Sequence, residues 1–111
     1  MEQIHIDDFK KVDIRIGEIL SAEKVENADK LLRLSVSFGS EVRQIISGIS
    51  AYFPDPQALV GVKCPFVYNL APRVIRGLES RGMIMAAVDE ATGTFSLMKA
   101  DQSLPAGATV R

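Results

Sequence analysis

The sequence predicts a small all-β domain, either a barrel or a sandwich, that also contains one short helix. Apolar and polar residues alternate in several short runs, turn-forming residues recur about every 8 to 12 positions, and one proline-flanked stretch has the composition of a helical turn. The 111 residues are enough to bury a core but too few for two domains of ordinary size. We therefore expect residues 1–111 to form a single domain.

Alternation with a period of two predicts the first three strands. Within residues 12–19, one face carries Val12, Ile14 and Ile16 and the other carries Asp13, Arg15 and Gly17, as in a half-buried strand. Residues 31–38 repeat the pattern, with Arg33, Ser35 and Ser37 on the polar face. Residues 39–41 then predict a hairpin turn into a third strand, residues 42–49.

Prolines interrupt the pattern in residues 53–61 and exclude a strand interior there. Asp55 is a suitable helix cap, because Pro56 follows at the first helical position and Gly61 stands at the expected end. This segment therefore predicts one short helical turn.

The second half of the chain predicts further strands. Residues 62–68 alternate again, but Pro65 falls on the polar face and suggests an edge strand or a bulge. Residues 82–90 and 94–98 predict two strands around a turn. Residues 104–110 have the composition of a closing loop.

No set of residues suits a catalytic site. His5 is the only histidine and lies near the N-terminus, and Asp7 with Asp8 suggests a solvated turn or the start of a helix. Cys64 falls on an apolar strand face, which favours a buried structural role. Because the sequence has neither metal-ligand spacing nor a glycine-rich phosphate loop, we expect a non-catalytic binding module without metal or cofactor.

Composition also predicts the compartment. The sequence has no apolar run of about 18 residues, and its N-terminus is polar and acidic, so we expect neither a membrane span nor a signal peptide. A single cysteine cannot form an internal disulfide, which suits a reducing environment. We therefore expect a soluble cytoplasmic protein.

The charge is nearly balanced in total but unevenly distributed. The formal net charge is −1, yet residues 1–29 carry −4 and residues 30–81 carry +4. Residues 69–83 set Glu79 against three arginines, Arg73, Arg76 and Arg81. Because arginine can donate two parallel hydrogen bonds to a phosphate, this segment suits nucleic acid, while an ordinary solvated surface is the alternative.

Other segments could complete an RNA groove of cations, hydroxyls and soft apolar groups. Arg33 lies on a polar strand face, Arg43 and Gln44 open the next strand, and Ser80 and Met83 end the cationic segment. Aromatic residues make up only 6% of the chain, and Phe38, Phe66 and Tyr68 are expected to face the core. A stacking platform rich in rings is therefore not expected.

Four segments in order and spacing resemble the tRNA-binding domain family: DFKKVDIRIGEILSAEKVENADKLLRLSVSFG, RQIISGI, NLAPRVIRG and ESRGMIMAA. The resemblance extends from Ile6 to the C-terminus. The family includes free-standing dimeric proteins, a C-terminal appendage of bacterial methionyl-tRNA synthetase and CsaA-like export chaperones. The phrase YFPDPQALVG followed by NLAPR is most similar to the methionyl-tRNA synthetase branch, whereas the later part of the CsaA-like proteins differs.

The resemblance implies a five-stranded oligonucleotide-binding (OB-fold) barrel with a short helix and additional terminal elements. It also implies a homodimer that binds tRNA through its shape, largely independently of sequence, with the methionyl-tRNA synthetase catalytic domain as a further possible partner. A protein-interaction or CsaA-like chaperone module is the competing interpretation, and its binding would depend on apolar surface and respond little to salt.

Several RNA-binding residues are implied by the matched motifs. The NADKL, RQIISG, NLAPR and SxGM segments together give Asn27, Asp29, Lys30, Arg43, Gln44, Ser47, Asn69, Arg73, Ser80 and Met83. The cationic pattern adds Arg33, Arg76 and Arg81 to this set. Among them, Lys30, Arg43 and Arg73 are the favoured phosphate contacts.

Some of these positions have structural alternatives. Asp29 could cap a turn, Asn69 could satisfy loop backbone groups, and Met83 could fill the core. The sequence also departs from the family at Val74, where a basic residue is common, and at Arg81, which adds a cation to the SxGM motif.

Overall fold

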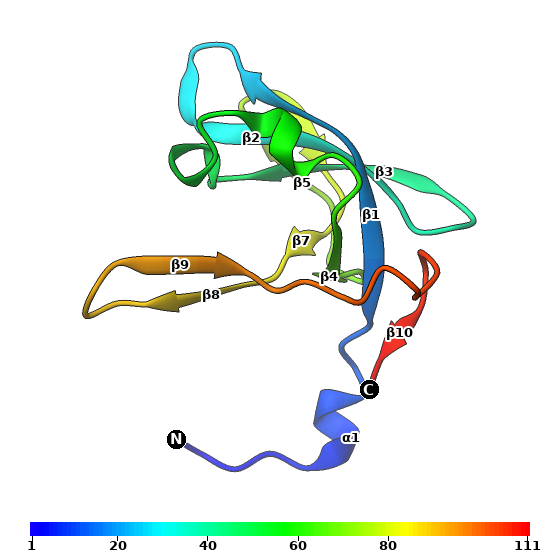
Figure 1. Cartoon of the computed structure of the whole chain (residues 1–111). Coiled ribbons are helices and arrows are strands. Elements are labelled where there is room, and N and C mark those ends of the chain that lie inside the picture. The colour runs from blue at the N-terminus through cyan, green and yellow to red at the C-terminus, as the bar shows by residue number, and fades with distance from the viewer.

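The computed structural model describes residues 1–111, and Figure 1 shows a body of β-strands from which an N-terminal arm and one hairpin extend. The elements in chain order are α1 (Ile6–Phe9), β1 (Ile14–Val25), β2 (Ala28–Ser37), β3 (Val42–Ser47), the 3-10 turns η1 (Ser50–Tyr52) and η2 (Pro56–Leu59), β4 (Lys63–Val67), β5 (Arg73–Ile75), β6 (Leu78–Ser80), β7 (Met83–Ile84), β8 (Ala86–Asp89), β9 (Thr94–Leu97) and β10 (Thr109–Val110). The predicted mostly β class is confirmed.

Six strands form one antiparallel sheet in the order β3-β2-β1-β4-β7, with β10 paired to β1. β1 is long enough to serve two neighbours, because it pairs with β4 from Ile14 onward and with β2 from Glu18 onward. No continuous ladder joins the outer strands β3 and β7. They are linked instead at Arg81, whose N–H donates to the Gln44 carbonyl of β3 at 2.9 Å. Closure of the sheet into the expected five-stranded barrel stays a prediction.

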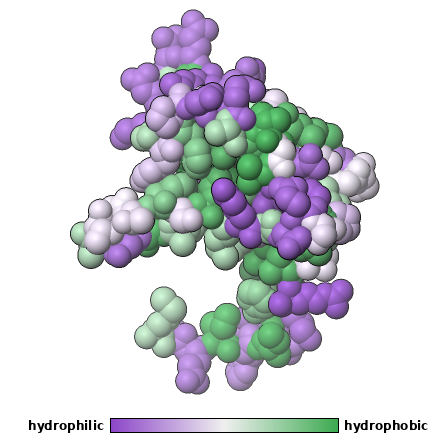
Figure 2. All heavy atoms as spheres, viewed as in Figure 1, coloured by the Kyte–Doolittle hydropathy of each residue, from purple (hydrophilic) through white to green (hydrophobic).

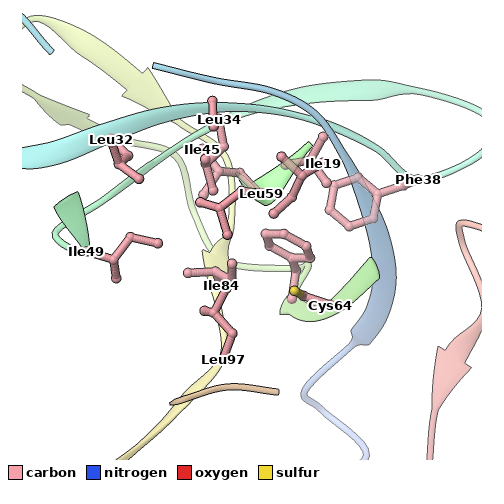
Figure 3. Close-up of a cluster of buried hydrophobic side chains, with 13 residues drawn as sticks. Ile19, Leu32, Leu34, Phe38, Ile45, Ile49, Leu59, Cys64, Ile84 and Leu97 are labelled. Carbon is pink, nitrogen blue, oxygen red and sulfur yellow. The ribbon is translucent and has the colours of Figure 1, made fainter. Parts of the chain in front are cut away.

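The core lies against the inner face of this sheet, as Figure 3 shows. Its largest fully buried side chains are Phe66, Ile19, Leu32, Leu34, Ile45, Leu59, Val36 and Cys64. Burying each large apolar side chain contributes about 1.5–3 kcal/mol, so this cluster supplies much of the driving force for folding. The expected inward orientation of Phe38 and Phe66 is confirmed, and their rings meet edge to face at 5.5 Å.

The predicted faces of β1 need correction. The expected apolar series is only partly buried, since Ile14 and Ile16 are buried outside the main core cluster and Val12 is 41% exposed. Gly17, expected on the polar face, points into the core, where a Cβ would lie 2.5 Å from Val36 Cγ1. Both faces of the first half of β1 are covered, because Ile14 and Ile16 on one face and Gly17 and Ile19 on the other are all buried. The C-terminal segment lies along one edge of this half, where the Ile16 N–H donates to the Ala108 carbonyl at 2.8 Å.

The expected helical turn is confirmed, although it is a 3-10 turn. The Asp55 side chain caps η2 by accepting from the Gln57 N–H at 3.1 Å, and Pro56 occupies its first position. β4 as a whole lies between β1 and β7, but Pro65 pairs only with Ile16 of β1, so the expected edge is present locally at Pro65. The β4–β7 ladder begins only at Phe66, so the missing N–H of Pro65 interrupts no ladder hydrogen bond.

The C-terminal half contains two hairpins outside the main sheet. The predicted strands in 82–90 and 94–98 are present as β7, β8 and β9. The loop expected at 104–110 is partly wrong, because residues 109 and 110 form β10 and pair with β1. The hairpin β5–β6 was not expected as a strand pair.

Candidate nucleic-acid interface

The hairpin β5–β6 carries two of the three arginines of the cationic segment. Its strands pair Arg73 with Ser80 and Ile75 with Leu78, which leaves a two-residue turn at the tip. Arg76 (φ 52°) and Gly77 (φ 79°) fill this turn, and positive φ at both central positions suits the right-handed twist of a tight hairpin. The turn geometry therefore projects Arg76 from the tip.

Neutral groups dock this hairpin on the edge of β3. The Ser80 hydroxyl oxygen accepts from the Ile46 N–H at 3.0 Å, and the Gln44 side-chain amide donates to the Glu79 carbonyl at 3.0 Å. The Arg81 N–H completes the contact through the Gln44 carbonyl. Ser80 is buried, so this hydroxyl holds the hairpin in place and is not open to a ligand.

The cations fall into two groups according to whether an acid neutralises them. Arg15, Arg33 and Arg43 form ion pairs with Asp13, Glu23 and Glu41, respectively. By contrast, Lys30, Arg73, Arg76 and Arg81 have no carboxylate oxygen within 4.0 Å. Lys30, Arg73 and Arg76 are also exposed, so their charge is available to an anionic ligand.

The tip of the hairpin separates two hollows. One, of about 500 Å³, lies between Arg76 and the β1–β2 turn and is lined by Asn27, Asp29 and Lys30. The other, of about 380 Å³, lies between Arg76 and the outer face of β1 and β2, which bears Arg33. The structure thus brings together five predicted residues from distant parts of the sequence.

A third, smaller hollow of about 70 Å³ lies at the base of the hairpin, between Arg73, Ser80 and Met83. Met83 is half-exposed at 50% and Val74 is exposed at 74%, so soft apolar groups stand beside the arginine. Met83 is therefore not core filler.

Other predicted residues have internal partners. The Asn69 side-chain oxygen Oδ1 accepts from the Asp13 N–H at 2.8 Å, and its side-chain nitrogen Nδ2 donates to the Lys11 carbonyl at 2.7 Å. These bonds attach the N-terminal segment to the residue that follows Tyr68. Ser47 lies half-buried at the end of β3, opposite Leu32.

Sequence reasoning missed a charged cluster around Tyr68. Its ring lies between two guanidinium groups, with Arg43 Cζ 3.5 Å and Arg15 Cζ 4.0 Å from the ring centroid. The Tyr68 hydroxyl donates to Glu41, which also accepts from Arg43 Nε. The charges at Glu41 and Arg43 stand on either side of a single strand residue, which is the only sequence signal for this cluster.

The cluster shifts the pKa of its members. Hydrogen bonds from Tyr68 and Arg43 lower the pKa of the Glu41 carboxyl. Burial, followed by the hydrogen bond to Glu41, raises the pKa of the Tyr68 phenol. The hydrogen bond that Arg15 donates to Asp13 raises the pKa of Arg15. Arg15 and Glu41 therefore stay charged and the Tyr68 phenol stays neutral at physiological pH.

Elsewhere the structure offers little for chemistry. Cys64 is buried, and burial raises the pKa of its thiol to about 11, which keeps the thiol protonated and unreactive. No group of three or more histidine, cysteine, aspartate or glutamate side chains is placed to hold a metal ion. No helix is long and apolar enough to cross a membrane.

The arrangement is a docked cationic hairpin beside two hollows of about 500 and 380 Å³. A family model described as "Putative tRNA binding domain" matches residues 14–109. This chain belongs to the tRNA-binding domain family. The resemblance found in the four sequence motifs is thereby confirmed.

Relatives within the family include parts of much longer proteins. A methionine–tRNA ligase of Deinococcus radiodurans is 50% identical over 108 residues, which cover 97% of this chain and 16% of the ligase. A methionine–tRNA ligase of Methanocaldococcus jannaschii is 45% identical over 111 residues, which cover 100% of this chain and 17% of the ligase. The chain of this tRNA-binding domain therefore spans about a sixth of these ligases.

Solved structures of whole small proteins are also similar. A MetRS related protein from Pyrococcus horikoshii has a TM-score of 0.94 and 39% identity, with 100% of both chains covered. The chaperone CsaA of Bacillus anthracis has a TM-score of 0.87 and 27% identity, with 99% of this chain and 100% of that chain covered. The tRNA-binding domain is thus related both to synthetase-associated proteins and to CsaA proteins.

Proposed function

We propose that this domain holds tRNA by its shape, with little sequence preference, on the surface formed by the hairpin β5–β6 and the β1–β2 turn. The observation that carries the proposal is the gathering of exposed cations without carboxylate partners at Lys30, Arg73 and Arg76. A surface that recognises the RNA backbone needs hydrogen-bond donors to phosphate at fixed separations and few contacts with bases. A docked hairpin supplies such fixed positions.

Each predicted residue has a place in this proposal. Lys30, Arg73, Arg76 and Arg81 attract phosphate, while Asn27 and Asp29 line the larger hollow, where they can hydrogen-bond sugar or base. Met83 offers a soft apolar surface beside Arg73. The remaining residues shape the surface on which these groups stand: Arg33, Arg43, Gln44, Asn69 and Ser80 have internal partners, and Ser47 is half-buried in β3.

We further propose that the sheet closes into an oligonucleotide-binding barrel. The hydrogen bonds between β3 and residues 79–81 hold the chain that leads into β7 beside the opposite outer strand, which supports closure. In such barrels one outer face and its loops bind nucleic acid. The hairpin and the outer face of β1–β3 stand in those positions.

A homodimer is the assembly that the exposed apolar side chains support. Ile4, Ile6 and Phe9 of the N-terminal arm are 68%, 65% and 37% exposed, and Val88 of β8 is 55% exposed. Figure 2 shows green, apolar side chains along this arm, below the extended hairpin β8–β9. Pairing of two copies through these elements, outside the sheet, would bury them in a closed two-fold contact.

We propose that the domain serves in the cytoplasm as the C-terminal appendage of a methionyl-tRNA synthetase or as a free-standing equivalent, and that it supplies binding and not catalysis. The matched ligases support this role, because a non-catalytic tRNA holder would raise the local concentration of substrate at a synthetase active site.

Binding of bulk tRNA at several salt concentrations tests the proposal, with single-stranded DNA and an unstructured RNA measured in parallel. We expect tRNA to bind more tightly than either strand, with an affinity that falls steeply as salt rises. Equal affinity for all three would exclude recognition of tRNA shape. Salt-independent binding of unfolded polypeptides, with no tRNA binding, would support the competing chaperone role that the similarity to CsaA suggests.

A further inference from the structure

We propose that Arg43 is a positioning residue that clamps both ends of the hairpin β5–β6 and does not itself touch RNA phosphate. This inference rests on the proposed function of the hairpin. Arg43 Nη1 lies 2.7 Å from the Tyr68 carbonyl oxygen and 3.5 Å from the Arg81 carbonyl oxygen. Tyr68 directly follows β4, ahead of the loop 69–72 that leads into β5, and Arg81 directly follows β6. One guanidinium therefore joins the chain on either side of residues 69–80, which contain the hairpin.

Arg43 itself is held firmly. Its Nε donates to Glu41 at 2.5 Å, its guanidinium stacks on the Tyr68 ring, and its side chain is only 13% exposed. Glu41 accepts from the Tyr68 hydroxyl as well, so acid, phenol and guanidinium fix one another. With its charge paired, its Nε and Nη1 engaged and its side chain mostly buried, Arg43 has little left to offer a phosphate.

The bonds around Arg43 make the hairpin roots a rigid unit. The Tyr68 N–H donates to the Asp13 carbonyl at 2.7 Å, and the Arg81 N–H donates to the Gln44 carbonyl. Each of these backbone hydrogen bonds holds only one of the two flanking residues, Tyr68 or Arg81, whereas the hydrogen bonds of Arg43 reach both. Lysine cannot replace this function, because it lacks the planar fork that donates in two directions while stacking on a ring.

The clamp matters because Arg73 and Arg76 lie beyond it. Without the clamp, the two arginines would keep their charges but the hairpin that carries them would be more mobile. Binding tRNA would then have to order the hairpin, and this entropic cost would lower the affinity. Arg43 therefore acts on affinity through the hairpin.

Glu41→Gln tests the clamp, because the clamp and a purely electrostatic account predict opposite changes in tRNA affinity. Removing an acid near a polyanion site should strengthen binding if only charge matters. The clamp predicts the opposite, a tRNA affinity about threefold to tenfold weaker, because Gln holds Arg43 less firmly. Glu90→Gln, at an exposed turn where the carboxylate forms no ion pair, is the matched control, and we expect no weakening there. A tRNA affinity of Glu41→Gln that equals or exceeds that of the unchanged protein would overturn the proposal.

A double-mutant cycle separates the clamp from a direct contact. Arg43→Lys keeps the charge, and we expect about threefold to tenfold weaker tRNA binding in the otherwise unchanged protein. In a background with Arg73→Ala and Arg76→Asn, the same change should cost less than about twofold, because the hairpin no longer contributes cations. Equal costs in both backgrounds would show that Arg43 contacts RNA independently.

Hydrogen exchange of the free protein tests the clamp without RNA. We expect faster exchange at residues 73–80 in Glu41→Gln and Arg43→Lys, while amides of β1 and β2 and the Glu90→Gln control stay unchanged. Unchanged exchange at the hairpin would overturn the clamp. If exchange changes but Arg73→Ala with Arg76→Asn leaves tRNA affinity intact, the proposed interface is wrong and the clamp stands.

Discussion

The two hairpins outside the main sheet, β5–β6 and β8–β9, differ in what holds them and in what they present. The first is docked on β3 by Ser80, Gln44 and backbone groups, and it presents Arg73 and Arg76. The second is rooted by the Met85 N–H on the Pro65 carbonyl and by the Ala100 N–H on the Lys63 carbonyl, and its turn bears acids. Docking by neutral groups leaves the arginines of β5–β6 without partners and available to an anion.

The second hairpin is apolar where it meets the body. The Phe95 ring of β9 stacks on Tyr52 at 4.0 Å and meets Phe53 edge to face at 6.1 Å. Val88 and Met98 remain exposed on the hairpin and beyond it. A hairpin of this composition is suited to another protein surface and repels RNA at its acidic turn. The comparison therefore supports our proposals that β5–β6 contacts tRNA and that β8–β9 self-associates together with the N-terminal arm.

Removing the cations of β5–β6 should have the largest effect. We expect Arg73→Ala with Arg76→Asn to weaken tRNA binding by roughly tenfold to a hundredfold and to lower the salt slope by about 1.5, as loss of two phosphate contacts requires. Asn is chosen because it tolerates the positive φ at position 76. The control, Lys99→Ala with Arg111→Ala, removes two exposed charges elsewhere, and a similar loss there would mean that only net charge matters.

Gly17→Ala should weaken the sheet on which both hairpins stand. The added Cβ would lie 2.5 Å from Val36 Cγ1 and 2.9 Å from the Phe38 and Phe66 rings, so we expect about 1–3 kcal/mol lower unfolding free energy in urea. Gly48→Ala is the matched control, because its Cβ would meet nothing closer than the Lys30 carbonyl at 3.9 Å. Equal stability of the two variants would contradict the burial of position 17.

Polar changes in the N-terminal arm should separate assembly from RNA contact. We expect Ile6→Ser with Phe9→Ser to weaken dimerisation by about tenfold or more in analytical ultracentrifugation, because each exposed apolar side chain loses about 1 kcal/mol or more of burial. Val74→Ser, on the hairpin β5–β6, should leave dimerisation unchanged. A dimer that survives the first variant and dissociates with the second would reverse the assignment of the two surfaces.

The smallest effect concerns pH at the root of β5–β6. The pKa of Glu41 is lowered from its ordinary value of 4.5, so its contribution to stability is present above about pH 4.5 and is lost as pH falls through the lowered value. The pKa of Tyr68 is raised from 10.0, so its contribution is present below about pH 10 and is lost at higher pH. We expect the stability difference between the unchanged protein and Glu41→Gln to shrink below about pH 4. A constant difference would mean that Glu41 has no lowered pKa.

Alternation located the three long strands, because period two follows from the pleat itself. It missed residues 20–25 of β1 and 28–30 of β2. It could not predict which face of β1 lies inward, since both faces are covered and Gly17 has no side chain to reveal its direction. Asp55 and Pro56 predicted their turn, because capping depends only on local chemistry.

The site was predicted less completely. Exposed cations such as Arg73 and Arg76 could be found as a charge cluster in the sequence, but the three-residue strands that carry them are too short for a periodic signal. The internal roles of Arg43, Asn69 and Ser80 depend on partners 25 or more residues away, at Tyr68, Asp13 and Ile46. Such long-range hydrogen bonds leave no local trace in the sequence.

The most direct test of the account is hydrogen exchange at the two hairpins with and without saturating tRNA. The account predicts slower exchange on tRNA addition at residues 73–80 and in the β1–β2 turn, with no tRNA-dependent change at residues 86–97 beyond that caused by dimerisation alone. Protection at residues 86–97 with none at 73–80 would contradict the assignment of tRNA to the cationic hairpin.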